Sequence, residues 1–423
     1  MAQLTDDCFA FGGDLMSAEE ALARLRAVAV PVTETESVPL AACLGRILAE
    51  DVIAGRSVPP HDNSAVDGYA LYFDNLASDG ETVLPIAGRA AAGHSFEQPL
   101  RQGTALRIFT GAPMPQGAGE GEAPDTVLMQ EDCREENGRV VVPPGIARGA
   151  NRRKAGEDIA AGDRALAAGR RLRPQDIGLA ASLGLTALPL RKPLRVALFS
   201  TGDELRDPGQ AAPLGAVYDA NRATVAALLA QAGMAVTDLG ILPDRAATIR
   251  DALAEAAEGH DAVITSGGMS TGEEDHVHAA VEALGRLDFW RLAVKPGRPV
   301  GLGRIGRAAF IGLPGNPVAV MVTYLRFARP LLLGLAGCTE TEPRLYPVRA
   351  DFTHRKKAGR REWVRASLRN GPDGAPLAAK FPRDGAGILS SLVGSDGLVE
   401  LGEAVTAVAP GDMVDFLPFS EVS

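Results

Sequence analysis

The stretch LRVALFS, from Leu194 to Ser200, is a near-continuous apolar run. A strand buried on both faces of a parallel sheet has this composition. Downstream, further apolar runs alternate with segments of helical length. The expected strands are 194–200, 235–243, 261–267, 288–295, 299–305 and 308–315, and the expected helices are 221–234, 244–260, 273–285 and 316–335. This alternation predicts a doubly wound α/β domain.

The sequence on either side of this domain has a different texture. Ser17 and Glu20 form a capping box, which predicts a helix from Ser17 to Val28. A second helix is expected over residues 40–49, and a third over 174–184, returning to pack on the first ones. Residues 65–142 contain short β-like runs separated by Gly and Pro, typical of a small all-β domain.

The sequence therefore predicts a multidomain α/β plus β protein. The four expected parts are an elongated helical linker region formed by 1–48 and 150–190, a small all-β domain at 49–149, the α/β domain at 191–337, and a C-terminal β-barrel-like domain at 338–423. A chain of 423 residues exceeds what one hydrophobic core organises, which agrees with several domains.

Composition excludes several classes of protein. The chain has 43 Lys and Arg against 53 Asp and Glu, a net charge of −10 that disfavours nucleic acid and acidic membrane surfaces. The longest apolar stretch, Tyr324 to Leu335, is interrupted by Arg326, Arg329 and Pro330, so no membrane span is expected. Four scattered cysteines without a CxxC pair, and no visible secretory signal, suit a reducing cytoplasm.

Ligands of open α/β sheets bind outside the carboxyl ends of the strands, and three such ends carry polar, Gly-rich sequence. The first is FSTGDEL. Ser200, Thr201 and Gly202 offer donors to a phosphate, and Asp203 and Glu204 are candidate metal ligands. The alternative is a plain turn with solvated acids, because such short motifs also match by chance.

The second end is TSGGMSTGEED. Gly267 and Gly268 allow close backbone approach and positive φ, and Ser270 adds a hydroxyl. Gly272 opens a helix whose first turn is acidic and includes Asp275. Those acids either cap the helix or bind a Mg²⁺ ion that neutralises a phosphate. The segment lacks the P-loop ending and the GxGxxG spacing, so neither an ATPase nor a dehydrogenase follows.

The third end consists of KPGRP and GLPGNP. Lys295 and Arg298 flank a Pro-Gly turn, and both can reach one anion. Asn316 is a candidate helix N-cap, Pro317 suits the first helical position, and Pro314 would shape a pocket wall. The alternative is a rigid turn followed by an ordinary cap.

Polar loops also occur outside the α/β domain. In PPHDNSAVDGYA, Asp62 or Asp67 is either a metal ligand or base, or part of an Asx-turn. FTGAPMP offers Thr110. The charged run 152–154 is interpreted as a solvated face, and His278 as a helix-face histidine rather than a metal ligand.

Taken together, DNSAVDGYA, FTGAPMP, AGEDI, STGDEL, SGGMSTGEED, KPGRP and GLPGNP occur in this order. In that order they resemble the molybdopterin molybdotransferases, the molybdenum-insertion enzymes of molybdenum cofactor biosynthesis. The resemblance spans nearly the whole chain and includes the E domain of gephyrin. It implies an elongated homodimer that converts adenylylated molybdopterin and molybdate to molybdenum cofactor with release of AMP, assisted by Mg²⁺. Other proteins of this biosynthesis are implied as partners.

The resemblance also implies roles for individual residues. The catalytic and metal-binding candidates are Asp62, Glu204, Asp244 and Asp275, of which Asp62 would act across the dimer together with the substrate-binding Thr110. The other substrate-binding candidates are Ser200, Thr201, Gly202, Gly267, Gly268, Ser270, Gly272, Lys295, Arg298, Pro314, Pro317 and Arg360.

Two positions depart from the family pattern. Arg298 replaces a frequent lysine, and Ala386 stands where a serine hydroxyl is frequent. Two other functions remain as alternatives, namely adenylyl transfer from ATP to molybdopterin and a non-catalytic gephyrin-like scaffold.

Overall fold

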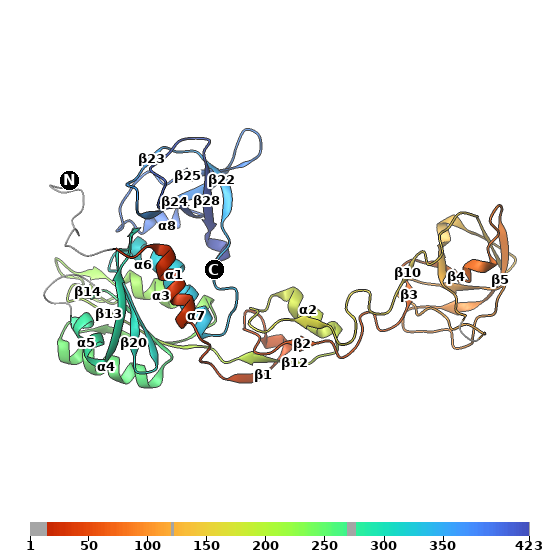
Figure 1. The fold of residues 1–423 in the computed structure, drawn as a ribbon, viewed down its shortest axis with the longest axis horizontal. Helices are drawn as coiled ribbons and strands as arrows, with labels where there is room; N and C mark the ends of the chain where they lie inside the picture. The colour runs from red at the N-terminus through yellow and green to blue at the C-terminus, as the bar shows by residue number, and fades with distance from the viewer. Residues whose placement is uncertain (1–14, 120–121, 269–275, 423) are drawn as a thin grey trace.

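The computed structural model describes residues 15–119, 122–268 and 276–422. The molecule is elongated, with the α/β domain and the C-terminal barrel at one end and the small β domain at the other (Figure 1). A narrow connecting region joins the two ends. The predicted multidomain α/β plus β fold class is confirmed.

The α/β domain has a six-stranded sheet in the order β16-β13-β17-β21-β20-β18. The first four strands pair in parallel, β20 pairs antiparallel with β21, and β18 pairs antiparallel with β20. Their bounds are β13 Arg195–Thr201, β16 Ala235–Leu242, β17 Ala262–Ser266, β18 Gly285–Arg291, β20 Pro299–Ile305 and β21 Ala308–Leu313. A short pair, β14 Leu205–Arg206 and β15 Val217–Tyr218, extends from the loop after β13.

Both faces of this sheet are covered, as its apolar strands predict. Val196 and Leu198 of β13 point into one core, and Ala197 and Phe199 point into the other. The first core is closed by α1 Ala18–Val28, α3 Ala220–Gln231 and the helix that starts at Pro317, and the second by α4 Ala246–Gly259 and α5 His276–Leu284. Ser17 caps α1 by accepting a hydrogen bond from the Glu20 N–H.

The last helix runs from Pro317 to Leu335 as α6 Pro317–Thr323, a π-helical segment η4 Tyr324–Ala328, and α7 Arg329–Leu335. Pro330 has no N–H to donate, which explains a break in the regular α-helical bonding at this point. By length and composition this helix is apolar enough to cross a membrane, although Arg326, Arg329 and Pro330 interrupt it. Since 94% of its most apolar window of 18 residues is buried inside the protein, it is a core helix.

The connecting region pairs β1 Thr35–Pro39 with β12 Ala187–Arg191, and β2 Val52–Ile53 with β11 Arg164–Leu166. Helix α2 Pro174–Ser182 packs in this region and α1 packs in the α/β domain. The helix predicted over 40–49 is wrong, because only the 3₁₀ turn η1 Leu40–Ala42 forms. Gly45 then takes a φ of +74°, and the following residues make β-bridges instead.

The small β domain contains a six-stranded sheet in the order β7-β4-β6-β5-β9-β8. Its strands are β4 Gly68–Leu71, β5 Thr82–Ala90, β6 Ala105–Ile108, β7 Thr126–Met129, β8 Arg134–Glu136 and β9 Arg139–Val142. The 3₁₀ turns η2 Phe73–Asn75 and η3 Gln130–Asp132 follow two of them. At the domain's inner end, β3 Asn63–Ser64 pairs with β10 Arg152–Arg153.

The C-terminal domain is a closed barrel, because β24 pairs with both β25 and β26. Its strands are β22 Tyr346–Ala350, β24 Arg361–Asn370, β25 Pro376–Lys380, β26 Gly397–Leu401 and β28 Met413–Pro418, with the small pair β23 His354–Arg355 and β27 Ala407–Val408, helix α8 Ser390–Val393 and the turn η5 Phe419–Glu421. A further strand, β19 Val294–Lys295, comes from the α/β domain and pairs with β24. The single strand predicted over 288–295 is therefore divided between two sheets.

Candidate active site

Three buried hydroxyls lie at the carboxyl edge of the α/β sheet. Ser200 and Thr201 end β13, and Thr265 stands beside them in β17. All three side chains are at most 3% exposed, and none of the hydroxyls has a hydrogen-bond partner within the described part of the chain. A buried polar atom without a partner costs about 1–3 kcal/mol. Such a cost at the expected ligand edge indicates groups reserved for a ligand's polar atoms.

Glycines bring the backbone close to these hydroxyls. Gly267 has a φ of +90°, and a Cβ there would lie 2.6 Å from the carbonyl oxygen of Thr201. Gly268 has a φ of +66°, and its Cβ would lie 2.4 Å from a methyl of Val277. A side chain at either position is therefore excluded by space as well as by conformation. The predicted Ser270, Gly272 and Asp275 lie outside the described residues.

Two predicted acids follow neighbouring strands at the same edge. Glu204 comes after β13 and Asp244 after β16, and these strands pair in parallel up to Thr201 and Leu242. The Glu204 carboxylate is the nearest group to a Cβ built on Gly202, at 2.7 Å, so it folds back over the predicted phosphate loop. Across the described ranges, no group of three or more Asp, Glu, His or Cys side chains is arranged to hold a metal ion.

His278 lies on α5, where its Nδ1 is 3.8 Å from a carboxylate oxygen of Glu282 one turn later. Its side chain is partly exposed. This position agrees with the interpretation as a helix-face histidine.

The KPGRP and GLPGNP segments lie against the same end of the domain. A Cβ on Gly297, whose φ is +99°, would lie 2.5 Å from a methyl of Thr323, so the turn packs directly on α6. Pro317 opens α6 as predicted. Asn316 occupies the N-cap position, but its side chain makes no capping hydrogen bond. The Pro314 carbonyl accepts a 3.5 Å hydrogen bond from the Ser266 hydroxyl.

Lys295 meets Arg360 through a residue that the sequence analysis passed over. The Glu362 carboxylate, only 2% exposed, lies 3.3 Å from Lys295 Nζ and 3.4 Å from a guanidinium nitrogen of Arg360. His354 Nε2 is 3.1 Å away. Burial opposes ionisation, but the hydrogen bond with His354 and the charge of Lys295 hold the pKa of Glu362 below its ordinary value. Two predicted cations therefore belong to one cluster.

Arg365, a buried arginine of β24, holds a loop of the barrel in place. Its buried guanidinium donates to the Ser391 hydroxyl at 3.0 Å and to the carbonyls of Arg383 and Gly385 at 3.1 and 3.2 Å. The loop that these bonds hold contains Ala386, whose carbonyl accepts from the Val318 N–H at the start of α6. The barrel therefore contributes a wall next to GLPGNP.

The small β domain holds its own polar cluster. Asp67 accepts hydrogen bonds from the backbone N–H of Thr110 at 2.8 Å and from its hydroxyl at 2.7 Å. These two bonds lower the pKa of Asp67. Asp62 accepts from the Ala155 N–H at 2.8 Å and lies 3.6 Å from Arg152.

Arg152 had been interpreted as part of a solvated run. The pairing of β3 with β10 instead places it beside Asp62, with its side chain only 22% exposed.

Within one chain, these two groups of predicted residues are not brought together. Asp62 directly precedes β3, and Asp67, the partner of Thr110, directly precedes β4. Figure 1 shows β3 and β4 at the opposite end of the molecule from β13. That Asp62 and Thr110 act from a second subunit stays a prediction.

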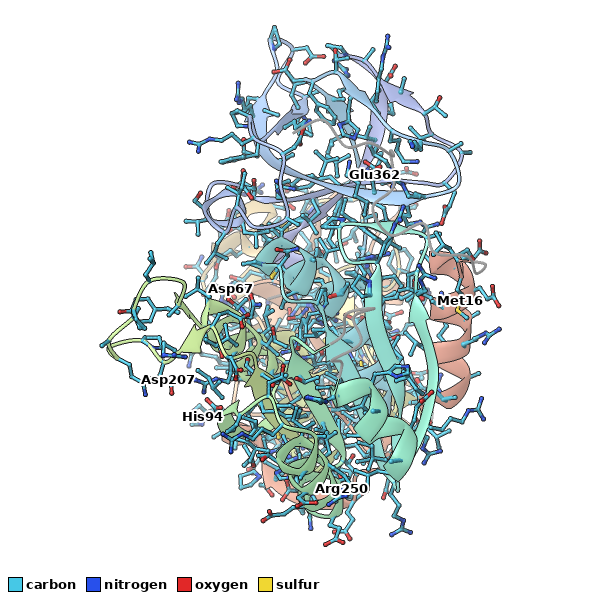
Figure 2. The ribbon with its side chains drawn as sticks, turned by 90° about the vertical axis from the view of Figure 1, so that its left-hand side faces the viewer. Met16, Asp67, His94, Asp207, Arg250 and Glu362 are labelled. Carbon is cyan, nitrogen blue, oxygen red and sulfur yellow. The ribbon has the colours of Figure 1, made fainter. Side chains whose placement is uncertain are left out.

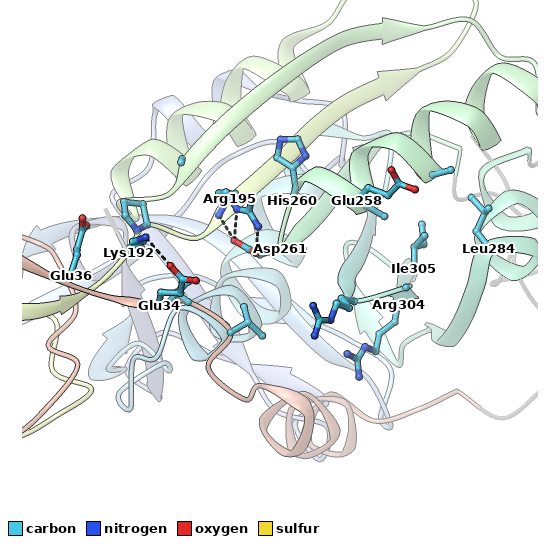
Figure 3. A pocket seen from close by; sticks show the side chains of 18 residues that line it. Glu34, Glu36, Lys192, Arg195, Glu258, His260, Asp261, Leu284, Arg304 and Ile305 are labelled. Atoms are coloured by element: carbon cyan, nitrogen blue, oxygen red, sulfur yellow. Dashed lines mark hydrogen bonds and ion pairs between the residues drawn. The ribbon is translucent and has the colours of Figure 1, made fainter.

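A cavity of about 1160 Å³ occupies the other edge of the α/β sheet (Figure 3). Arg195, Ala235 and Asp261 line it at or just before the starts of their strands. Lys192 pairs with Glu34 at 2.8 Å and Arg195 pairs with Asp261 at 2.9 Å in its wall. None of the predicted site residues lines it, so it is separate from the carboxyl-edge site.

Comparison with known families matches three stretches of the chain. Residues 16–184 match the MoeA N-terminal region (domain I and II), 197–334 match the probable molybdopterin binding domain, and 347–419 match the MoeA C-terminal region (domain IV). The fold and this site therefore define an α/β domain of the molybdopterin-binding class, in which glycines line the carboxyl edge of the sheet.

Similar proteins align with this chain along nearly its full length. The molybdopterin molybdenumtransferase of Haemophilus influenzae is 36% identical over 92% of this chain and 95% of its own. Molybdopterin molybdenumtransferase 2 of Mycobacterium tuberculosis is 33% identical over 89% and 93%. The crystal structure of the molybdopterin biosynthesis moeA protein from Pyrococcus horikoshii OT3 superposes with a TM-score of 0.83, at 27% identity, covering 96% of this chain and all of that one. The chain belongs to the MoeA family of molybdopterin molybdenumtransferases, transferases of molybdenum cofactor biosynthesis.

Proposed function

We propose that the chain inserts molybdate into adenylylated molybdopterin and releases AMP, giving molybdenum cofactor. The observation that carries this proposal is the set of three unpartnered buried hydroxyls, Ser200, Thr201 and Thr265, at the carboxyl edge, where the glycine loop approaches Thr201. A phosphate offers the acceptor oxygens that these donors lack. Cleavage of the pyrophosphate link by water transfers the water's oxygen to phosphorus and leaves AMP.

Molybdate is the second substrate, and the cations beside the carboxyl edge suit it. Lys295 and Arg360 lie around Glu362. Arg298 follows Lys295 in the Pro-Gly turn of KPGRP. A dianion is stabilised by fixed cations that need not rearrange when it binds. We assign the wall of the substrate site to Pro314 and Pro317. The phosphate contacts are assigned to Gly202, Gly267, Gly268, Ser270 and Gly272.

A homodimer completes the site in this proposal. Asp62 and Thr110 are each held by hydrogen bonds, to Ala155 and Asp67, but the neighbouring strands β3 and β4 lie at the far end of the molecule from β13 (Figure 1). An isologous dimer would place this end of each subunit against the α/β domain of the other. The four parts that we propose for each subunit are 1–48 with 150–190, 49–149, 191–337 and 338–423.

Mg²⁺ is proposed to assist by neutralising phosphate charge, with Asp62, Glu204, Asp244 and Asp275 as candidate ligands. Among the described residues of one chain these carboxylates do not form a complete metal site. Glu204 and Asp244 provide acids from one subunit and Asp62 would come from the other, so the Mg²⁺ proposal depends on the dimer. We also propose a cytoplasmic location, with other proteins of molybdenum cofactor biosynthesis as partners.

Release of AMP from adenylylated molybdopterin, with molybdate and Mg²⁺ added, tests the function directly. A shared site is tested by mixing two inactive variants, Asp62→Ala and Lys295→Ala. If each site combines both subunits, a mixed dimer has one intact site, and random mixing restores about a quarter of wild-type activity. No recovery in dimers shown to have exchanged subunits would reject the shared site. Absence of AMP release by the wild-type protein, with or without Mg²⁺, would reject the function.

A further inference from the structure

Lys295 and Glu362 face each other across the joint between two domains. They are register partners in β19 and β24, strands that come from the α/β domain and from the barrel. Lys295 Nζ lies 3.3 Å from Glu362 Oε2. Figure 2 labels Glu362 in the barrel, above the α/β domain. The proposed molybdate-binding lysine is therefore held by a carboxylate that belongs to another domain.

Both oxygens of Glu362 are occupied by donors. Oε2 accepts from Lys295 and from His354 Nε2, and Oε1 accepts from Arg360. Lys380 Nζ lies 3.4 Å from His354 Nδ1. Since an ammonium group only donates, Nδ1 accepts and the His354 proton lies on Nε2, directed at Glu362. One carboxylate thus fixes two cations and an imidazole.

A second buried glutamate in the same barrel provides a comparison. Glu400 lies 3.1 Å from Arg326 of the last α/β helix and accepts from Trp363 Nε1 at 2.8 Å. The cation of that pair is shielded from solvent, because the Arg326 side chain is only 5% exposed. The Lys295 side chain is 54% exposed, although its partner Glu362 is as buried as Glu400. Lys295 therefore has ammonium donors left over for a ligand.

The charges around Glu362 favour an anion. Lys295 and Arg360 carry two positive charges against one carboxylate, and the remaining positive charge lies on the accessible side. A lysine side chain has high rotamer entropy. If Lys295 were unrestrained, it would lose this entropy on binding a ligand, and the affinity for the ligand would be lower. A fixed ammonium has already lost that freedom before the ligand arrives.

We propose that Glu362 is a positioning residue, which holds Lys295 and Arg360 at the spacing and orientation needed to bind molybdate. This inference rests on the proposed function, because it takes these two cations as the molybdate site. Glu362 acts through them and does not touch the substrate itself. Its lowered pKa agrees with a permanently ionised carboxylate at neutral pH.

The test compares Glu362→Gln, Glu362→Asp and Glu400→Gln. An amide has one acceptor oxygen, so its NH₂ group must face either the Lys295 side or the Arg360 side, where donors already point. We expect Glu362→Gln to raise the KM for molybdate about tenfold, the effect of one lost charge-assisted hydrogen bond, with kcat within about twofold. Glu362→Asp keeps two acceptor oxygens and should recover part of the loss.

Glu400→Gln serves as the matched control, because it changes another buried glutamate, one that contacts no proposed ligand residue. It should lower thermal stability and leave the KM for molybdate unchanged. Molybdate binding by equilibrium dialysis provides a readout that needs no turnover. If the wild-type protein binds molybdate but releases no AMP, a weaker binding by Glu362→Gln still supports the inference while the proposed function fails.

Three results would overturn the inference. They are an unchanged molybdate KM in Glu362→Gln when the wild-type enzyme is active, tighter molybdate binding in that variant, and no molybdate binding by the wild-type protein. The first would leave the proposed function intact and make Glu362 purely structural, like Glu400.

Discussion

The guanidinium of Arg326 lies 3.1 Å from the carboxylate of Glu400, and both side chains are more than nine-tenths buried. Arg326 comes from the π-helical segment of the last α/β helix, and Glu400 comes from β26 of the barrel. Arg361 and Trp363 also bond to Glu400, at 3.0 and 2.8 Å. This buried contact fixes the barrel against the domain whose carboxyl edge carries the proposed site.

Arg326→Met removes one of the two cations that contact the buried Glu400 carboxylate, and Arg361 and Trp363 remain. Because a hydrogen bond to a buried charged group is lost, we expect the free energy of unfolding to fall by about 1.5–3 kcal/mol. The exposed pair Arg24 and Glu20, on α1, is the control, and Arg24→Ala should cost less than about 1 kcal/mol. Chemical denaturation of both variants gives the comparison. Equal effects would mean that the Arg326 contact does not hold the joint.

The sequence predicts the α/β domain well for a physical reason. Strands buried on both faces, such as Arg195–Thr201 and Ala262–Ser266, have an apolar middle that turns polar only at the ends, and segments of clear helical length lie between them. The segment 40–49 is equally apolar, but it turns at Gly45 and continues as isolated β-bridges. Periodicity alone cannot separate these two outcomes in a short segment.

The site was predicted less completely because its parts meet through strand pairing. Nothing in the spacing of KPGRP indicates that Lys295 joins a barrel strand, or that its partner is Glu362. Similarly, the pairing of β3 with β10 brings Arg152 to Asp62 from about ninety residues away. Residue type does give a signal for Glu362. A glutamate directly before the apolar Trp363 and Val364 is a candidate for a buried charge.

Gly267 tests the close backbone approach at the proposed phosphate loop. Alanine at a φ near +90° costs about 1–2 kcal/mol wherever it occurs. At Gly267 its Cβ would also meet the Thr201 carbonyl, whereas Gly209 has a φ of +91° and nothing within 4 Å. We expect Gly267→Ala to reduce AMP release about a hundredfold by displacing the loop. Gly209→Ala should retain activity, and similar activities in the two variants would contradict this account.

The unpartnered hydroxyl of Thr201 gives opposite expectations for stability and binding. Thr201→Val removes a buried polar atom that has no partner in the described structure, so the free energy of unfolding should rise by about 1 kcal/mol. Affinity for molybdopterin should fall, because the protein loses a hydroxyl that would donate a hydrogen bond to this ligand. The matched control is Thr126→Val, whose hydroxyl accepts from the Gly149 N–H and should cost stability without changing affinity. Denaturation and ligand titration distinguish the cases, and unchanged affinity in Thr201→Val would remove Thr201 from the site.

The bond between Asp67 and Thr110 predicts a pH dependence in the small β domain. Hydrogen bonds from the Thr110 backbone and hydroxyl lower the pKa of Asp67. Because the folded-state pKa is the lower one, the stabilisation is present above the unfolded value, about 3.9, and is lost as the pH falls through the folded value. Thr110→Val keeps the backbone bond and removes the hydroxyl bond, so the pKa of Asp67 should rise part of the way to its ordinary value.

A carboxyl NMR titration measures this shift directly. Asp373 provides an internal control, because its pKa is also lowered, by Arg349 and the Ala375 N–H in the distant barrel. Its titration should be the same in both proteins, which separates a local effect from a general loss of structure. If Asp67 titrates identically with and without the Thr110 hydroxyl, that hydroxyl does not hold the carboxylate in solution. Thr110 would then be free to turn toward a ligand, and Asp67 would not be the group that orients it.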